Sequence, residues 1–107
     1  MSNRNDENPT VPHSVEIEQS GNGGAIIYRE GDNTVRFGWE FAMPPAIALL
    51  FGPSALQWSH YPAWATGRQA EIFAAVGNEV VRQKAQGGDF TVDLDTGIIE
   101  VLRNKRA

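Results

Sequence analysis

Few side chains in this sequence have the types and spacing that catalysis needs. Ser59 and His60 could act as a nucleophile and a base, but they are direct neighbours. Neighbouring side chains on an extended segment point apart, whereas a general base must come within about 3 Å of the group that it deprotonates. The chain also lacks the Gly-x-Ser-x-Gly turn that presents a nucleophilic serine. We therefore interpret Ser59 and His60 as a polar pair in a loop.

Metal and phosphate sites are equally poorly supported. The spacing Asp93-x-Asp95-x-Gly97 resembles the start of a calcium loop, but an EF-hand needs a glutamate at its twelfth position, which here is Asn104. Cysteine is absent, which excludes disulfides, thiol nucleophiles and cysteine-based metal sites. The glycines of residues 21–24 join two predicted strands and have no lysine nearby, unlike a loop that holds a phosphate at a helix N-terminus. We predict no catalytic residues, no metal and no cofactor.

Glu40 is a candidate for recognition of a partner. It alternates with Trp39 and Phe41 along a predicted strand, so its carboxylate lies on the opposite face of the sheet. That carboxylate either faces solvent, paired with Arg36 two positions away, or belongs to a recognition surface on an open sheet face.

The aromatic segment that follows is a second candidate. Its members are Trp58, Tyr61 and Trp64, with His60 among them. Trp and Tyr are enriched at binding hot spots, but in a small domain they also cover the core. Trp64 and Arg68 are four residues apart on a predicted helix, so they could stack as a cation–π pair.

The elements that must position these residues follow from periodicity. Alternation predicts antiparallel strands, and Pro44-Pro45 ends the third of them because proline cannot donate to a sheet ladder. A short helix is expected over Ala46–Phe51, before Gly52-Pro53. A long helix is expected from Pro62 to about Gln86, ending at Gly87-Gly88. The strands are predicted over residues 14–19, 25–30, 34–41, 90–94 and 98–102, with an irregular connection over residues 54–61 and a hairpin loop in which Gly97 is left-handed. The side chains expected to face the core are Val35, Phe37, Trp39 and Phe41 of the third strand and Ile72, Phe73, Val76 and Val80 of the long helix.

The sequence therefore predicts an α+β fold, a two-layer sandwich in which one long helix packs on a sheet of about five antiparallel strands. The 107 residues suggest one domain, over residues 13–102, between a disordered tail at 1–12 and a basic tail at 103–107. No apolar run is long enough to span a membrane and no secretory signal is visible, so a cytoplasmic location is expected.

Charge is unevenly distributed along the chain. The net charge is −4, and residues 13–102 carry 11 acidic and 5 basic side chains. Such an acidic body does not suit a nucleic-acid backbone, which is bound by Lys and Arg, but it suits a basic protein partner.

Three segments of the chain also carry a resemblance. Residues 64–72 (WATGRQAEI), 79–85 (EVVRQKA) and 95–99 (DTGII) together look like small bacterial proteins that are grouped with polymorphic-toxin immunity proteins. The likeness covers roughly the C-terminal half, and more loosely Ile27–Trp39. It implies a cytosolic protein that binds and blocks a cognate toxin.

The leading hypothesis is accordingly a non-catalytic protein-binding module of the immunity type. Two alternatives remain open: a small-molecule-binding or enzymatic α+β domain with a pocket near Glu40 and His60, and a self-associating structural subunit. The residues expected to contact a protein partner are Glu16, Glu18, Glu40, Trp58, His60, Tyr61, Trp64 and Arg68.

Overall fold

The computed structural model describes residues 11–103 of the chain. An antiparallel sheet and one long helix, α3 (Gln69–Lys84), dominate it, which confirms the predicted α+β class. The sheet has six strands in the order β1-β2-β3-β4-β6-β5, one more than the sequence predicted. Their bounds are β1 (Ser14–Ser20), β2 (Gly23–Glu30), β3 (Asn33–Phe41), β4 (Ala46–Phe51), β5 (Asp89–Asp93) and β6 (Ile98–Leu102).

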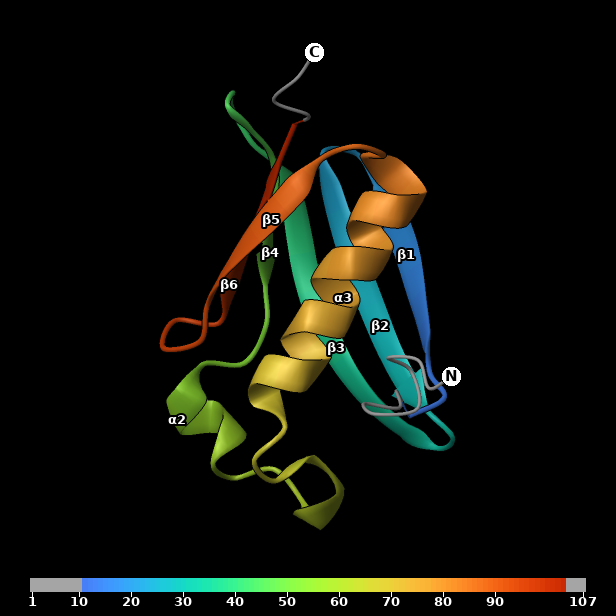
Figure 1. Ribbon diagram of the computed structural model, residues 1–107, viewed down its shortest axis with the longest axis vertical. Helices are drawn as coiled ribbons and strands as arrows, with labels where there is room; N and C mark the ends of the chain where they lie inside the picture. The colour runs from blue at the N-terminus through green and yellow to red at the C-terminus, as the bar shows by residue number, and fades with distance from the viewer. Residues whose placement is uncertain (1–10, 104–107) are drawn as a thin grey trace, which may run out of the picture.

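The molecule has two layers, because α3 lies across one face of the sheet (Figure 1). The first four strands each pair with their neighbour in the chain. The chain then passes through a short helix, α2 (Ala55–Trp58), and a 3₁₀ helix, η1 (Ala63–Ala65), beyond one end of the sheet (Figure 1). After α3 it returns through the edge strand β5 and enters β6 between β5 and β4.

The expectation of a helix over Ala46–Phe51 is wrong, since these residues form strand β4. The strand pairs with β3 on one side and with β6 on the other. Ala48 and Leu50 are buried, whereas Leu49 is half-buried and Phe51 is exposed, which is the two-residue period of a strand. Six consecutive apolar residues are compatible with either element, so the hydrogen bonds available on both sides decide the outcome.

The long helix is shorter at its start than predicted. Gly67 has a φ of +73°, in the left-handed region, so a right-handed helix cannot continue through it from Pro62. The regular helix begins only at Gln69. At the other end the helix stops at Lys84, two residues before the predicted Gln86, and its C-cap is Ala85. Gly87 does adopt the predicted left-handed conformation, with a φ of +84°, but in the turn that follows the cap.

A short helix also replaces the irregular segment that was expected after Gly52-Pro53. The backbone N–H of Gln57 donates to the Ser54 hydroxyl at 3.1 Å, and the Ser54 N–H donates to the Gln57 side-chain carbonyl at 2.9 Å. This reciprocal capping box starts α2.

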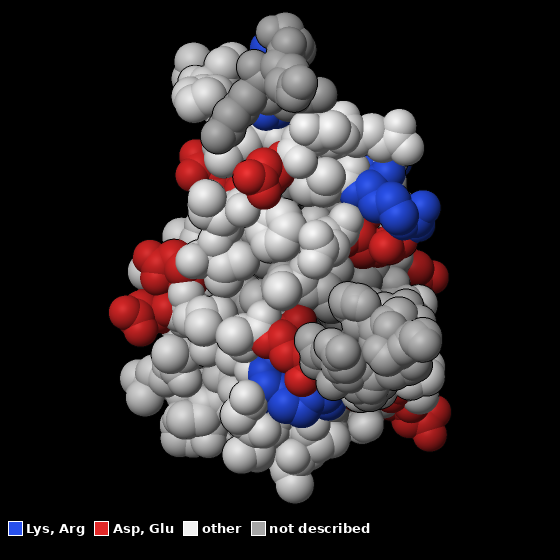
Figure 2. Space-filling model, in the orientation of Figure 1, with Lys and Arg blue, Asp and Glu red and all other residues white. Residues whose placement is uncertain are grey.

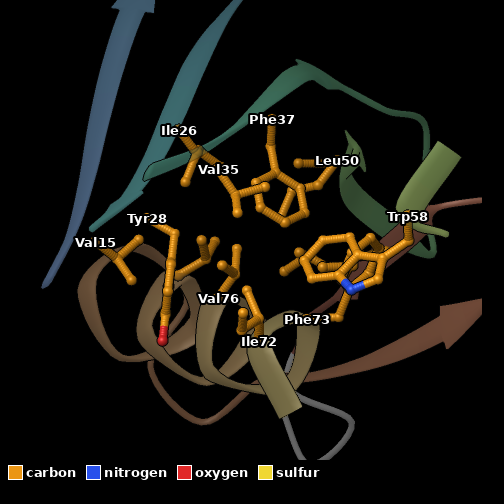
Figure 3. Packing of buried hydrophobic residues seen from close by; sticks show 14 of the residues in the cluster. Val15, Ile26, Tyr28, Val35, Phe37, Leu50, Trp58, Ile72, Phe73 and Val76 are labelled. Atoms are coloured by element: carbon orange, nitrogen blue, oxygen red, sulfur yellow. The ribbon is translucent and has the colours of Figure 1, made fainter. Parts of the chain in front are cut away.

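The core lies between α3 and the sheet (Figure 3). The predicted inward residues Val35 and Phe37 are 1% and 0% exposed. Phe73 of α3 packs edge-on against Phe37, with ring centroids 5.0 Å apart. The predicted helical stripe is also confirmed, with Ile72, Phe73, Val76 and Val80 all buried.

Phe41 differs from this prediction. It continues the inward face of β3 but is 51% exposed. The helix ends at Lys84, so nothing in α3 covers the last residues of the strand. Trp39, one pleat earlier, is half-buried.

The predicted tails lie outside the described residues, apart from Val11, Pro12 and Arg103. Over residues 11–103, every helix is too short or too polar to cross a bilayer.

Candidate partner-binding surface

The sheet face turned away from α3 carries a row of acidic side chains. Glu40 of β3 and Glu100 of β6 both pair with Leu49 of β4, so they lie on either side of it. Strands are about 4.8 Å apart, which places the two glutamate Cα atoms about 10 Å from each other. Glu40 is exposed, and Glu100 and Leu49 are half-buried.

The neighbouring row of the same face is apolar in its middle. Phe51 pairs with Gly38 and with Ile98, and its side chain is 39% exposed. The row continues through Ala25 to the exposed Glu18 on β1. The apolar strip is therefore bordered by Glu40 and Glu100 along one side and ends at Glu18, whereas Arg36 and Ile27 lie along its other side. An apolar centre within a polar rim is an arrangement that interfaces share.

Glu16 lies on this face as well, and it is paired. The Arg29 guanidinium donates to its carboxylate at 3.2 Å, with both side chains about half exposed. Pairing with Arg36 was one of the two interpretations of Glu40, but these two described residues make no ion pair with each other. The strand residues of this face carry two arginines, Arg29 and Arg36, and six carboxylates: Glu16, Glu18, Glu40, Asp89, Asp93 and Glu100.

The aromatic segment lies elsewhere, beyond one end of the sheet. Trp58 is 5% exposed, and its indole N–H donates to the Ala65 carbonyl at 2.8 Å. Tyr61 stacks on it with ring centroids 4.7 Å apart, and burial raises the pKa of the Tyr61 hydroxyl. The structure thus places Trp58 in the core with Tyr61 as its cover, whereas His60 is exposed.

Arg68 makes structural contacts in the same region. Its guanidinium donates to both carboxylate oxygens of Glu30, at 3.1 and 2.6 Å, and to those of Glu71, at 3.0 and 2.7 Å. Its carbon Cζ lies 5.9 Å from the Trp64 ring centroid, so the predicted cation–π pair forms.

Glu30 is the one charged side chain among the described residues that is buried. The Tyr28 hydroxyl donates to its carboxylate. Hydrogen bonds from Arg68 lower the pKa of Glu30 and of Glu71, whereas burial raises the pKa of Tyr28. These four groups satisfy one another, so they join the start of α3 to strand β2.

The eight predicted contact residues therefore divide into two groups. Glu16, Glu18 and Glu40 share the open sheet face. The other five, Trp58, His60, Tyr61, Trp64 and Arg68, lie in the connection around α2 and η1 and at the residue before α3.

Sequence reasoning missed Glu100 and Phe51 as members of the open face. Alternation within β6 already puts Glu100 opposite the buried Ile99 and Val101, which was the available signal. Its position beside Leu49 required the order of the strands.

No cluster of three or more His, Cys, Asp and Glu side chains in the described part of the chain is arranged to hold a metal ion. Comparisons of the chain with protein-family models, with curated proteins and with solved structures find no significant match. The resemblance to immunity proteins therefore stays a prediction.

Proposed function

We propose that this protein is a non-catalytic protein-binding module, most concretely an immunity-type inhibitor that neutralises a cognate bacterial toxin. The observation that carries the proposal is the open sheet face, on which the exposed carboxylates of Glu18 and Glu40 lie beside an apolar strip. A basic protein surface with an apolar centre is the complementary partner.

The distribution of charge on this face supports recognition of a basic partner. Glu18 and Glu40 make no ion pair with another described residue, so their carboxylates are available to a partner's Lys or Arg. Opposite potentials across an interface accelerate association and exclude partners of the wrong charge. Phe51 supplies an aromatic anchor at the centre, where hot spots concentrate.

The proposal is tested by affinity capture from the native host with quantitative mass spectrometry. The bait is the wild-type chain, and the informative variant is Glu40→Lys. The matched control is Asp32→Lys, which makes the same charge change in the exposed turn between β2 and β3. We expect a basic protein captured by the wild type and by Asp32→Lys, and at least about tenfold less by Glu40→Lys, because like charges at an interface cost several kcal/mol.

Two results would count against the proposal. In the first, Glu40→Lys and Asp32→Lys reduce the amount of captured partner equally, which would mean a nonspecific effect of net charge. The other is a wild-type bait that recovers no protein partner, together with a concentration-dependent dimer mass in light scattering that Glu40→Lys abolishes. That second outcome would assign the open face to self-association. If a captured partner is a toxin domain, its co-expression with the wild-type chain, but not with Glu40→Lys, is expected to restore cell growth.

A further inference from the structure

The other side of the sheet contains a cavity that the proposed function does not use. It has a volume of about 190 Å³ and lies between the last turn of α3 and the end of the sheet. It is the space left where the helix ends before β3 does. Its walls are mainly apolar and come from five strands and the helix; they include Trp39, Phe41, Val80 and Ala85, with Gln19 and Lys84 as the polar members.

The polar groups beside this cavity already have partners in the protein. The indole N–H of Trp39 donates to the Glu18 carbonyl at 3.0 Å, and the Gln19 amide donates to the Gly21 carbonyl at 3.1 Å. Over the described residues, no buried side-chain nitrogen or oxygen lacks a hydrogen-bond partner. Such a cavity holds water poorly, because a water molecule needs two to four polar partners. An enclosed apolar cavity of about 150 Å³ takes up benzene, so the space here is large enough for one aromatic ring.

Among residues 11–103, the rim of the cavity carries one charge, and it is positive. Of the described lining residues, Lys84 is the only charged one, and no carboxylate accompanies it. It is exposed and makes no ion pair with another described residue. On the face that carries α3, much of the described surface is uncharged and the charges lie in separate small groups (Figure 2). A lysine ammonium beside an apolar cavity, with no carboxylate among the described lining residues, favours an anion at that point.

We propose that this cavity binds a small amphiphile, with an aryl or short alkyl body and a single anionic head group. The body lies against Trp39 and Phe41, and the head group lies at the rim beside the Lys84 ammonium. The volume accommodates a benzene ring with a short arm. The site is separate from the acidic face, so it stands whether or not that face binds a protein.

The test uses three probes that share one body and differ only in the head group: 3-phenylpropanoate, 3-phenylpropan-1-ol and 3-phenylpropylamine. Each is titrated into the isotopically labelled full chain, and backbone amide and tryptophan indole shifts are followed by NMR. We expect saturable chemical-shift changes at the lining residues and at the Trp39 indole. The affinity should be highest for the carboxylate, lower for the alcohol and lowest for the amine.

Three variants separate the two parts of the site. Lys84→Gln is expected to weaken binding of the carboxylate by about threefold to fivefold, as a partly exposed ion pair would, and to leave the alcohol unchanged. Arg82→Gln removes a cation from the same helix outside the lining and is the control that leaves both unchanged. Ala85→Phe, which fills the cavity from its half-buried rim, is expected to abolish binding of both probes.

The proposal is overturned if the carboxylate produces no saturable shifts at the lining residues. It is equally overturned if the amine binds as tightly as the carboxylate, or if Lys84→Gln and Arg82→Gln weaken the carboxylate alike. The lysine comparison needs no change inside the core, so it decides the question even where Ala85→Phe does not fold.

Discussion

The two carboxylates that share Arg68 offer a direct test of what burial does to an ion pair. Glu30 and Glu71 lie at nearly equal distances from the guanidinium, 2.6 and 2.7 Å at their closest. Their surroundings differ, because the Glu30 side chain is 9% exposed and the Glu71 side chain is 49% exposed. Glu30→Gln and Glu71→Gln therefore remove the same charge from the same partner, and they differ in burial and in the bond that Glu30 also accepts from Tyr28.

The cost of Glu30→Gln follows from the bonds that it breaks. The carboxylate accepts two bonds from Arg68 and one from Tyr28. A glutamine turns one of the two oxygens into an N–H donor that faces the guanidinium, so at least one charge-assisted bond is lost. Such bonds contribute about 1.5–3 kcal/mol each. We expect Glu30→Gln to lower the free energy of unfolding by about 2–3 kcal/mol, and Glu71→Gln, half exposed and screened by solvent, by no more than about 1 kcal/mol.

The measurement is urea unfolding of both variants beside the wild type, followed by tryptophan fluorescence, with thermal unfolding as a second assay. A loss of about 1 kcal/mol lowers the midpoint of a domain of this size by roughly 4–8 °C. Raising the salt concentration to 1 M is expected to shrink the effect of Glu71→Gln and to leave most of that of Glu30→Gln, since buried pairs are screened much less.

The same pair predicts a dependence on pH. Arg68 lowers the folded-state pKa of Glu30 below the ordinary value of 4.5. A carboxylate with a lowered pKa adds stability that is fully present above its unfolded pKa and is lost as the pH falls through the folded value. The gap between wild type and Glu30→Gln should thus be largest near pH 7 and should close as the pH falls below about 4.5. Equal costs for the two variants at pH 7, or a gap that stays constant down to pH 3, would refute the reasoning.

Two further substitutions test the packing around α3. Trp58→Phe removes the buried bond to the Ala65 carbonyl and part of the stack on Tyr61, so urea unfolding should show a loss of about 2 kcal/mol. The nearby Leu56→Ala, at a side chain 74% exposed, should stay within about 0.5 kcal/mol of the wild type, and a larger loss there would mean that the segment, not the indole, is sensitive. Gly77→Ala places a Cβ 2.4 Å from the Phe90 ring, so we expect it to destabilise the protein by about 1 kcal/mol, although alanine favours an isolated helix by a similar amount. Combining it with Phe90→Leu should recover most of that loss, and a stabilising Gly77→Ala would contradict the close approach.

Local patterns predicted much of the fold. The alternation of Val35 and Phe37 identified the buried face of β3, and the stripe from Ile72 to Val80 identified the buried face of the helix. These predictions hold because burial of one face imposes a period that is readable in the residues themselves. The left-handed conformations of Gly87 and Gly97 are also predictable from the residues themselves, because few residues other than glycine adopt a positive φ.

The candidate surface was only half predictable. Alternation places Glu16, Glu18 and Glu40 on the faces of their strands that point away from the core, and the hairpins β1-β2 and β2-β3 bring those faces together. The aromatic segment shows the limit of such reasoning. Trp58 covers the core because its ring packs edge-on against Phe73 of α3. That helix begins only at Gln69, so the pattern of residues around Trp58 does not record the contact.

The sequence by itself determined the class of fold, the inward faces of its strands and helix, and the acidic character of its body, because each of these depends on residues that are near one another in the chain. The tertiary structure alone decided that Ala46–Phe51 is a strand, that Glu100 lies beside Leu49, and that the helix ends short of Phe41 and leaves a cavity over Trp39. These outcomes depend on which strands share hydrogen bonds and where the helix crosses the sheet. Such contacts join residues far apart in the chain, where no local period records them.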